Sequence, residues 1–276
     1  MLPFKTFITE RVYQLDSKEN KQVEDVLQTY ERLFDPSVIG NKDPQKVYKK
    51  NLTKDGIFIG SIMFFDNASK QNREIPVYVS FEDVSADASF SDEDNVIELF
   101  YNQFDDLSTI LKRNKIAHEL FHAKQHYKKI TTGYKKAIGK RSLPSGDVAI
   151  RSERGYYFAP NEYPVQVASI IHEMDRQYRL ILKHIKSGNG RQFWEKQRQG
   201  FLRLLDMFLR SPKVITGNDL PSYLKDQERF IRALYRNKND VKYSKYYKDF
   251  KRKLYWFYQN LIKAKKDNGQ EAGIDL

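Results

Sequence analysis

The chain contains no cysteine among its 276 residues. This absence excludes a disulfide framework and every metal site with thiolate ligands. No apolar run approaches the roughly 18 residues that a membrane-spanning helix needs. The first residues, MLPFKTFITERVYQLD, mix charges with apolar residues and lack the apolar core of a signal peptide. We therefore expect an intracellular, cytoplasmic protein with no membrane partner.

Histidine is also scarce, and this scarcity limits where a metal can bind. The five histidines are His118, His122, His126, His172 and His184. Without cysteine, any metal must be held by these residues together with carboxylates. Such ligands suit Zn²⁺, although similar nitrogen and oxygen sites bind other divalent ions.

Charge is unevenly distributed along the chain, whose formal net charge is +12. Residues 229–266 hold thirteen Lys or Arg against two Asp, whereas residues 81–95 hold six acids and no base. A segregated basic region favours an anionic partner such as nucleic acid.

Hydrophobic spacing predicts an α+β fold, with a small sheet followed by a helical C-terminal region. Short apolar runs predict buried strands at 56–66, 75–81 and 96–101. Helical spacing predicts helices at 20–34, 105–127, 160–186, 191–210, 221–236 and 242–266. The acidic run 81–95 is predicted to be a loop, and 128–155 a loop or hairpin. Asp105 or Asp106 is expected to cap the second helix, and Asn161 the third.

The stretch KIAHELFHAKQ, residues 115–125, carries the strongest chemical signal. His118 and His122 are four residues apart, so on a helix they project from one face and can share one zinc ion. Glu119 lies about 100° around the helix, where it can reach a water without being a ligand. A metal-free polar cluster is the alternative, but burying two histidines and a glutamate without a metal would be costly.

AHELFHAKQ resembles the active-site helix of the zincin metallopeptidases, and the resemblance extends over roughly residues 56–186. Metzincins place a third histidine where this chain has Lys128, which argues against that branch. Gluzincin-like families take a glutamate from a downstream helix. The resemblance therefore implies Glu162 as third ligand, with Glu153 and Asp147 as rivals. Glu162 could instead be a first-turn glutamate favoured by the helix dipole.

Several neighbouring residues are further candidates for roles at the site. Thermolysin-like enzymes have an aspartate where this chain has Gln166, which could still orient a histidine. His126 lies about 12 Å along the helix from His118, too far to share a ligand shell. His172, or a tyrosine at 156 or 157, could stabilise an oxyanion. The resemblance also implies that VIELFY, residues 96–101, pairs with an extended substrate.

The two ends of the chain suggest different partners. FKTFITE resembles the short leader of internal head proteins of T-even-type phages, through Phe4, Phe7, Ile8 and Glu10. A small apolar segment docked on the domain is the alternative. Aromatics interleave with Lys and Arg in 242–260, which suits nucleic acid. Their helical spacing also fits the buried face of a helix: Tyr243, Tyr247, Phe250, Leu254, Phe257 and Leu261.

These observations predict a zinc-dependent endopeptidase that acts on a protein or peptide, and that is phage-encoded and packaged in a virion if the leader is genuine. His118, His122 and Glu162 would bind zinc, and Glu119 would be the general base. The predicted organisation is a segment 1–18, a metallopeptidase domain 19–186 and a basic helical region 187–276. The alternative is an inactive basic structural or DNA-associated protein with a zincin-like fold.

Overall fold

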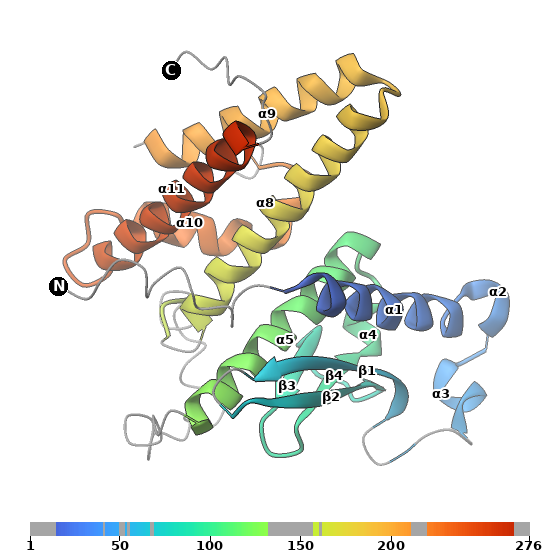
Figure 1. Ribbon diagram of the computed structural model, residues 1–276. Helices are drawn as coiled ribbons and strands as arrows, with labels where there is room; N and C mark the ends of the chain where they lie inside the picture. Colours follow the sequence, from blue (N-terminus) through green and yellow to red (C-terminus); the bar gives the residue numbers. More distant parts are fainter. Residues whose placement is uncertain are drawn as a thin grey trace. The chain divides into compact units, whose positions relative to one another are not determined.

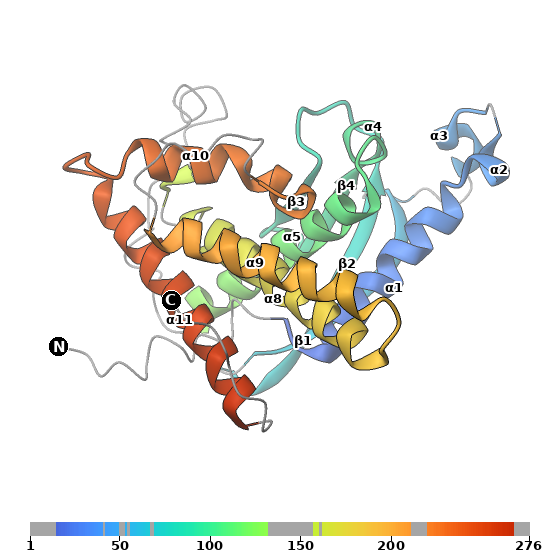
Figure 2. The same ribbon diagram turned by 90° about the horizontal axis from the view of Figure 1, so that it is seen from above.

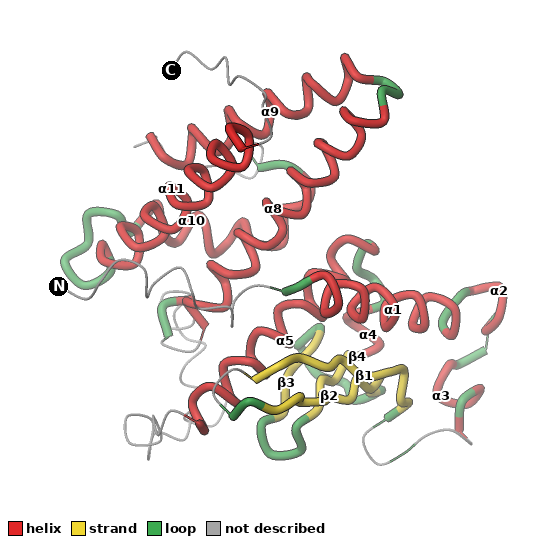
Figure 3. The backbone as a smooth tube through the Cα atoms, viewed as in Figure 1, coloured by secondary structure: helices red, strands yellow, loops and turns green. Residues whose placement is uncertain are grey.

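The computed structural model describes residues 15–40, 42–49, 53, 56–66, 69–131, 157–159, 162–210 and 220–267. The chain divides into two compact units, residues 1–148 and 149–276. The α+β prediction is confirmed: every described strand belongs to the first unit, and the second is helical where it is described (Figure 3). No described helix is long and apolar enough to cross a membrane. The predicted domains 1–18, 19–186 and 187–276 stay a prediction.

The first unit contains five helices and four strands in its described part. The helices are α1 (Ser17–Leu33), α2 (Pro36–Ile39), α3 (Pro44–Val47), α4 (Tyr101–Phe104) and α5 (Thr109–Thr131). The strands are β1 (Ile57–Asp66), β2 (Gln71–Ser80), β3 (Ala88–Ser91) and β4 (Val96–Phe100). All three predicted strands are therefore present, as β1, β2 and β4.

The strands form one mixed sheet in the order β1-β2-β4-β3. β1 and β3 pair antiparallel with their neighbours, whereas β2 and β4 are parallel. The prediction of a loop over 81–95 is wrong at β3, where Phe90 is paired with Ile97. The acids Asp92 and Asp94 lie just beyond the strand, in a turn where Asp94 bonds to Ser91. β4 is thus an inner strand, so the expectation that VIELFY offers a free edge to substrate is also wrong.

Helices α1 and α5 lie side by side and pack against the sheet (Figures 1 and 2). Alternation along β1, shifted by a register irregularity between Phe58 and Gly60, directs Ile57, Ile59, Ile62 and Phe64 into this core. Gly56, immediately before β1, has φ +114°, and a Cβ there would lie 2.2 Å from the Val79 carbonyl oxygen. Only glycine allows the chain to pass this close to β2.

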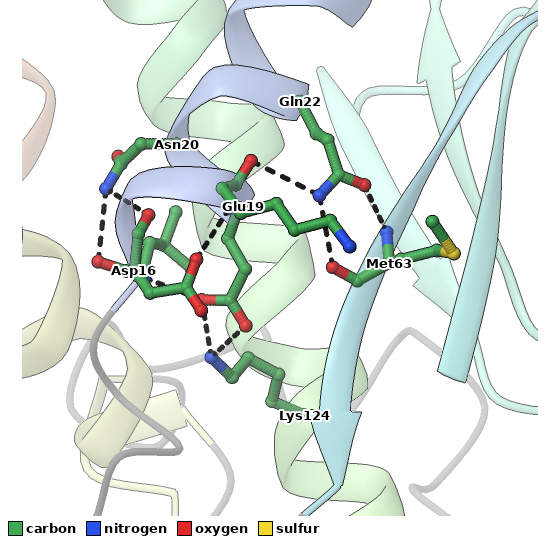
Figure 4. A network of polar contacts seen from close by, with 8 residues as sticks. Asp16, Glu19, Asn20, Gln22, Met63 and Lys124 are labelled. Atoms are coloured by element: carbon green, nitrogen blue, oxygen red, sulfur yellow. Dashed lines mark hydrogen bonds and ion pairs between the residues drawn. The ribbon is translucent and has the colours of Figure 1, made fainter. Parts of the chain in front are cut away.

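The start of α1 is tied to both the sheet and α5 by polar contacts (Figure 4). Asp16 and Glu19 form a capping box, each side chain accepting a hydrogen bond from the other's backbone N–H. The Glu19 carboxylate also pairs with Lys124 of α5 at 2.8 Å, and both side chains are buried. One turn on, the Gln22 amide bonds to the backbone N–H and C=O of Met63 in β1.

The second unit is built from α8 (Glu162–Ser187), α9 (Arg191–Arg210), the 3₁₀ helix η5 (Ser222–Gln227), α10 (Glu228–Arg236) and α11 (Ser244–Asp267). α8 and α9 form a hairpin (Figure 1), across which His184 stacks on Trp194 at 4.1 Å between ring centroids. The predicted buried face of the last helix is confirmed. Phe250, Leu254 and Phe257 are buried, and Tyr243, Tyr247 and Leu261 pack against the same core.

Candidate metal centre

Helix α5 carries the His-Glu-x-x-His motif but starts later than predicted, at Thr109. Neither Asp105 nor Asp106 immediately precedes this start, where the residue is Ser108. The Asp105 carboxylate instead accepts hydrogen bonds from the Tyr30 hydroxyl and the Lys112 ammonium group. The Ser108 hydroxyl accepts from the backbone N–H of Leu111. The Asp105 side chain is thus engaged in a tertiary contact, because Tyr30 lies in α1, 75 residues earlier in the chain.

The middle of α5 is buried on nearly all sides. Ile116, Leu120 and Phe121 are fully buried, and His118 and Glu119 are each only 8% exposed. His118, Glu119 and the partly buried His122 therefore stand together on a helix whose surroundings exclude most water. Buried polar groups of this kind need hydrogen-bond, ionic or metal partners, and the identity of these partners determines the chemistry of the cluster.

The two histidines of the motif face one another closely. Their Nε2 atoms are 3.2 Å apart, and the ring planes are inclined at 72°. Two nitrogens bound tetrahedrally to one zinc at the usual bond length would be about 3.3 Å apart. The pair therefore has the donor type and the spacing that a shared zinc ion requires.

Burial lowers the pKa of His118 well below its ordinary value, because an imidazolium would lose its hydration. The nearby charges of His122 and Lys115 lower the pKa of His118 further. His118 is consequently neutral at pH 7. A neutral imidazole is the form that binds a metal.

Glu162 is the first residue of α8 and is 9% exposed. One nitrogen from each of His118 and His122 and one carboxylate oxygen of Glu162 all lie within 4.8 Å of one another. The structure thus brings together the three predicted ligands, and this set could hold a metal ion. The rival ligands Asp147 and Glu153 lie outside the described residues, as does Asn161, the expected cap of α8.

The other residues singled out from the sequence have more ordinary surroundings. His126 is 26% exposed, packs edge-on against Phe90, and lies 3.9 Å from an Asp92 carboxylate oxygen. Tyr157 packs against Phe230, whereas Tyr156 is not among the described residues. Both His172, which is half-buried, and Gln166, which is buried, belong to α8.

The Glu19–Lys124 ion pair supports the motif helix, and sequence reasoning missed it. Lys124 follows His122 by two residues, but its partner is 105 residues away in the chain. The only available signal was the Asp16-x-x-Glu19 capping pattern, which predicts a helix start and says nothing of a lysine on another helix.

Comparisons of the chain with protein-family models, with curated proteins and with solved structures find no match. The proposed function therefore rests on the geometry of His118, His122 and Glu162.

Proposed function

We propose that the chain is a zinc-dependent metallopeptidase. The observation that carries this proposal is the 3.2 Å separation of the His118 and His122 Nε2 atoms on a buried helix, with a Glu162 oxygen nearby. The donors among the described residues are two imidazoles and one carboxylate, and three such ligands would leave one position of a four-coordinate zinc open, as catalytic zinc sites require. Structural zinc sites are instead closed by four protein ligands.

Each residue of the site has a distinct role in this proposal. Zinc, when bound, supplies a Lewis acid that lowers the pKa of water and polarises a peptide carbonyl. His118, His122 and Glu162 hold the ion in place. Glu119 accepts a proton from the attacking water and then delivers it to the leaving amine. Its 8% exposure places this carboxylate where bulk water does not compete for the proton.

Elemental analysis of the purified full-length protein tests the metal site. We expect about one zinc per chain, lost in His118→Ala and reduced in Glu162→Ala. His126→Ala is the matched control, because this histidine lies on the same helix but outside the ligand set. If the wild-type chain takes up no zinc at neutral pH, the metallopeptidase proposal fails. Loss in His118→Ala alone would move the third ligand away from Glu162.

Glu119→Gln separates metal binding from catalysis. This substitution removes the proton acceptor and retains the side chain's size, so we expect full zinc content and at least a hundredfold loss of peptide hydrolysis. The rate is measured as the release of free amines from an unstructured protein substrate such as casein. Equal rates for Glu119→Gln and wild type would contradict the assigned role.

An inactive structural or DNA-associated protein is the second candidate, favoured by the thirteen basic residues of 229–266. A zinc-free wild-type chain would support it. The proposed packaging in a phage head rests on Phe4, Phe7, Ile8 and Glu10, which lie outside the described residues. Mass spectrometry of the chain after incubation with a phage head-maturation protease would show whether cleavage follows Glu10.

A further inference from the structure

The side of α11 that faces away from the helical core carries a row of cations. Lys245, Lys248 and Arg252 are exposed and spaced three or four residues apart, so they project from one face. They extend over about 10 Å of the helix axis. Tyr255 continues the row, with 53% of its surface exposed. An aromatic ring this exposed contributes little to the core and is available to a ligand.

Helix α9 packs against α11 and adds further cations. Lys196, Arg203 and Arg210 are exposed and recur every seven residues, which places them on one side of α9. A mainly apolar pocket of about 330 Å³ lies between the two helices. Its lining consists of Leu202, Arg203, Asp206, Leu209, Arg210, Tyr255 and Tyr258. We call the cation rows and this pocket the α9–α11 surface.

Positive charge on the α9–α11 surface exceeds what its own acids neutralise. Asp206 pairs with Arg210, and Asp249 pairs with Arg252 and Lys253. Within the described part of the chain, Lys245, Lys248 and Arg203 form no ion pair. The Lys245 ammonium group lies over the Tyr246 ring, at 5.0 Å from its centroid. These cations remain available to an anionic partner.

We propose that the α9–α11 surface binds single-stranded nucleic acid. Phosphates would contact Lys245, Lys248 and Arg203, and a base would stack on Tyr255 at the mouth of the pocket. Rows of cations that follow a backbone, beside aromatic rings that receive bases, are the usual elements of single-strand binding. An acidic peptide would satisfy the cations but has no flat ring for Tyr255 or for the apolar pocket. This inference is independent of the zinc site.

Fluorescence anisotropy of a labelled 20-nucleotide oligo(dT) with the full-length chain tests the proposal. We expect saturable binding that weakens as salt increases. The triple variant Arg203→Glu, Lys245→Glu, Lys248→Glu should bind at least tenfold more weakly and reduce the slope of log K against log salt by about two. Tyr255→Ala should lose about tenfold, and Tyr255→Phe, which keeps the ring, should bind as wild type does.

A matched control separates this surface from net charge. Lys18, Lys42 and Lys49 are exposed residues of the first unit, and reversing all three changes the net charge by the same amount. This control should retain most of the binding. The proposal is overturned if both triple variants lose affinity equally, or if no oligo(dT) binds below about 10 µM at 0.1 M salt. Equal binding of a duplex or of polyglutamate, unaffected by Tyr255→Ala, would also overturn it.

Discussion

His118 illustrates how the environment of one residue sets its chemistry. Its pKa is lowered in the folded chain, so the unfolded chain binds more protons at mildly acidic pH. The sign follows directly: the free energy of unfolding of the metal-free protein decreases as pH falls below about 6.5. The contribution of this single group to the slope is at most about 1.4 kcal/mol per pH unit.

Urea denaturation between about pH 8 and pH 5, with a chelator present, measures this dependence. His118→Gln removes the titrating group, and we expect its curve to be flatter than that of wild type over the same range. His184→Gln is the control, since His184 is only half-buried, in the last turn of α8. Identical slopes for wild type and His118→Gln would show that burial of His118 does not control acid stability.

Gly56 lies where the chain leaves no room for a side chain. An added methyl group at Gly56 would lie 2.2 Å from a backbone oxygen, and φ is already +114° there. Gly56→Ala should therefore reduce the free energy of unfolding by about 2 kcal/mol or more.

Gly200 is the opposite case, because it lies inside α9 with open space around it. Gly200→Ala should stabilise the protein by about 0.5–1 kcal/mol. Chemical denaturation of both variants measures the difference. A neutral Gly56→Ala would mean that β1 and β2 approach less closely than this structure has them.

Among the elements, α1 and α5 are joined by a buried ion pair. Lys124 and Glu19 have side-chain exposures of 7% and 5%. Lys124→Met leaves the Glu19 carboxylate buried without its cation, which should cost about 3–5 kcal/mol. Adding Glu19→Gln removes the charge and should restore much of that loss. Thermal denaturation of the single and double variants, with Lys18→Met as an exposed control, tests this; a double variant less stable than Lys124→Met would contradict it.

Element types were largely predictable from the sequence, whereas element partners were not. α9 and α11 match their predicted ranges almost residue for residue, because their apolar spacing is sustained over many turns. β3 was missed because only Ala88 and Phe90 distinguish it within an acidic run. Its formation depends on β4, which no local pattern reveals. The start of α5 was misplaced because Asp105 bonds to Tyr30, a contact made only in the folded chain.

In the candidate site, too, the residues of one helix were predictable from the sequence, whereas contacts between distant parts of the chain were not. His118, Glu119 and His122 were identifiable because one helix turn fixes their relative positions. Glu162 is forty residues after His122 and was inferred from a resemblance, and the structure brings it to the same place. Glu19 and Lys124 could not have been paired, since neither residue type nor spacing connects them.

For the whole molecule, metal binding should be measurable as stability. A ligand that binds only the folded chain stabilises it by mass action, by about 2.7 kcal/mol at one hundred times its dissociation constant. We therefore expect zinc to raise the Tm of wild type, and a chelator to reverse the effect. His118→Ala should show no zinc-dependent change. A similar zinc effect in His118→Ala would place the ion elsewhere in the chain.

The contact between Gln22 and Met63 affects whether copies of the chain can associate through β1. β1 is an edge strand of ten residues with Phe58, Met63 and Phe65 exposed, a combination that invites strands from other molecules to add. The Gln22 side-chain amide donates to the Met63 carbonyl oxygen and accepts from the Met63 N–H, as a peptide group of a neighbouring strand would, and its nitrogen also donates to the Lys18 carbonyl oxygen (Figure 4). At Met63 a side chain thus takes the place of an incoming strand, which works against the addition of strands from other molecules at this point of the edge.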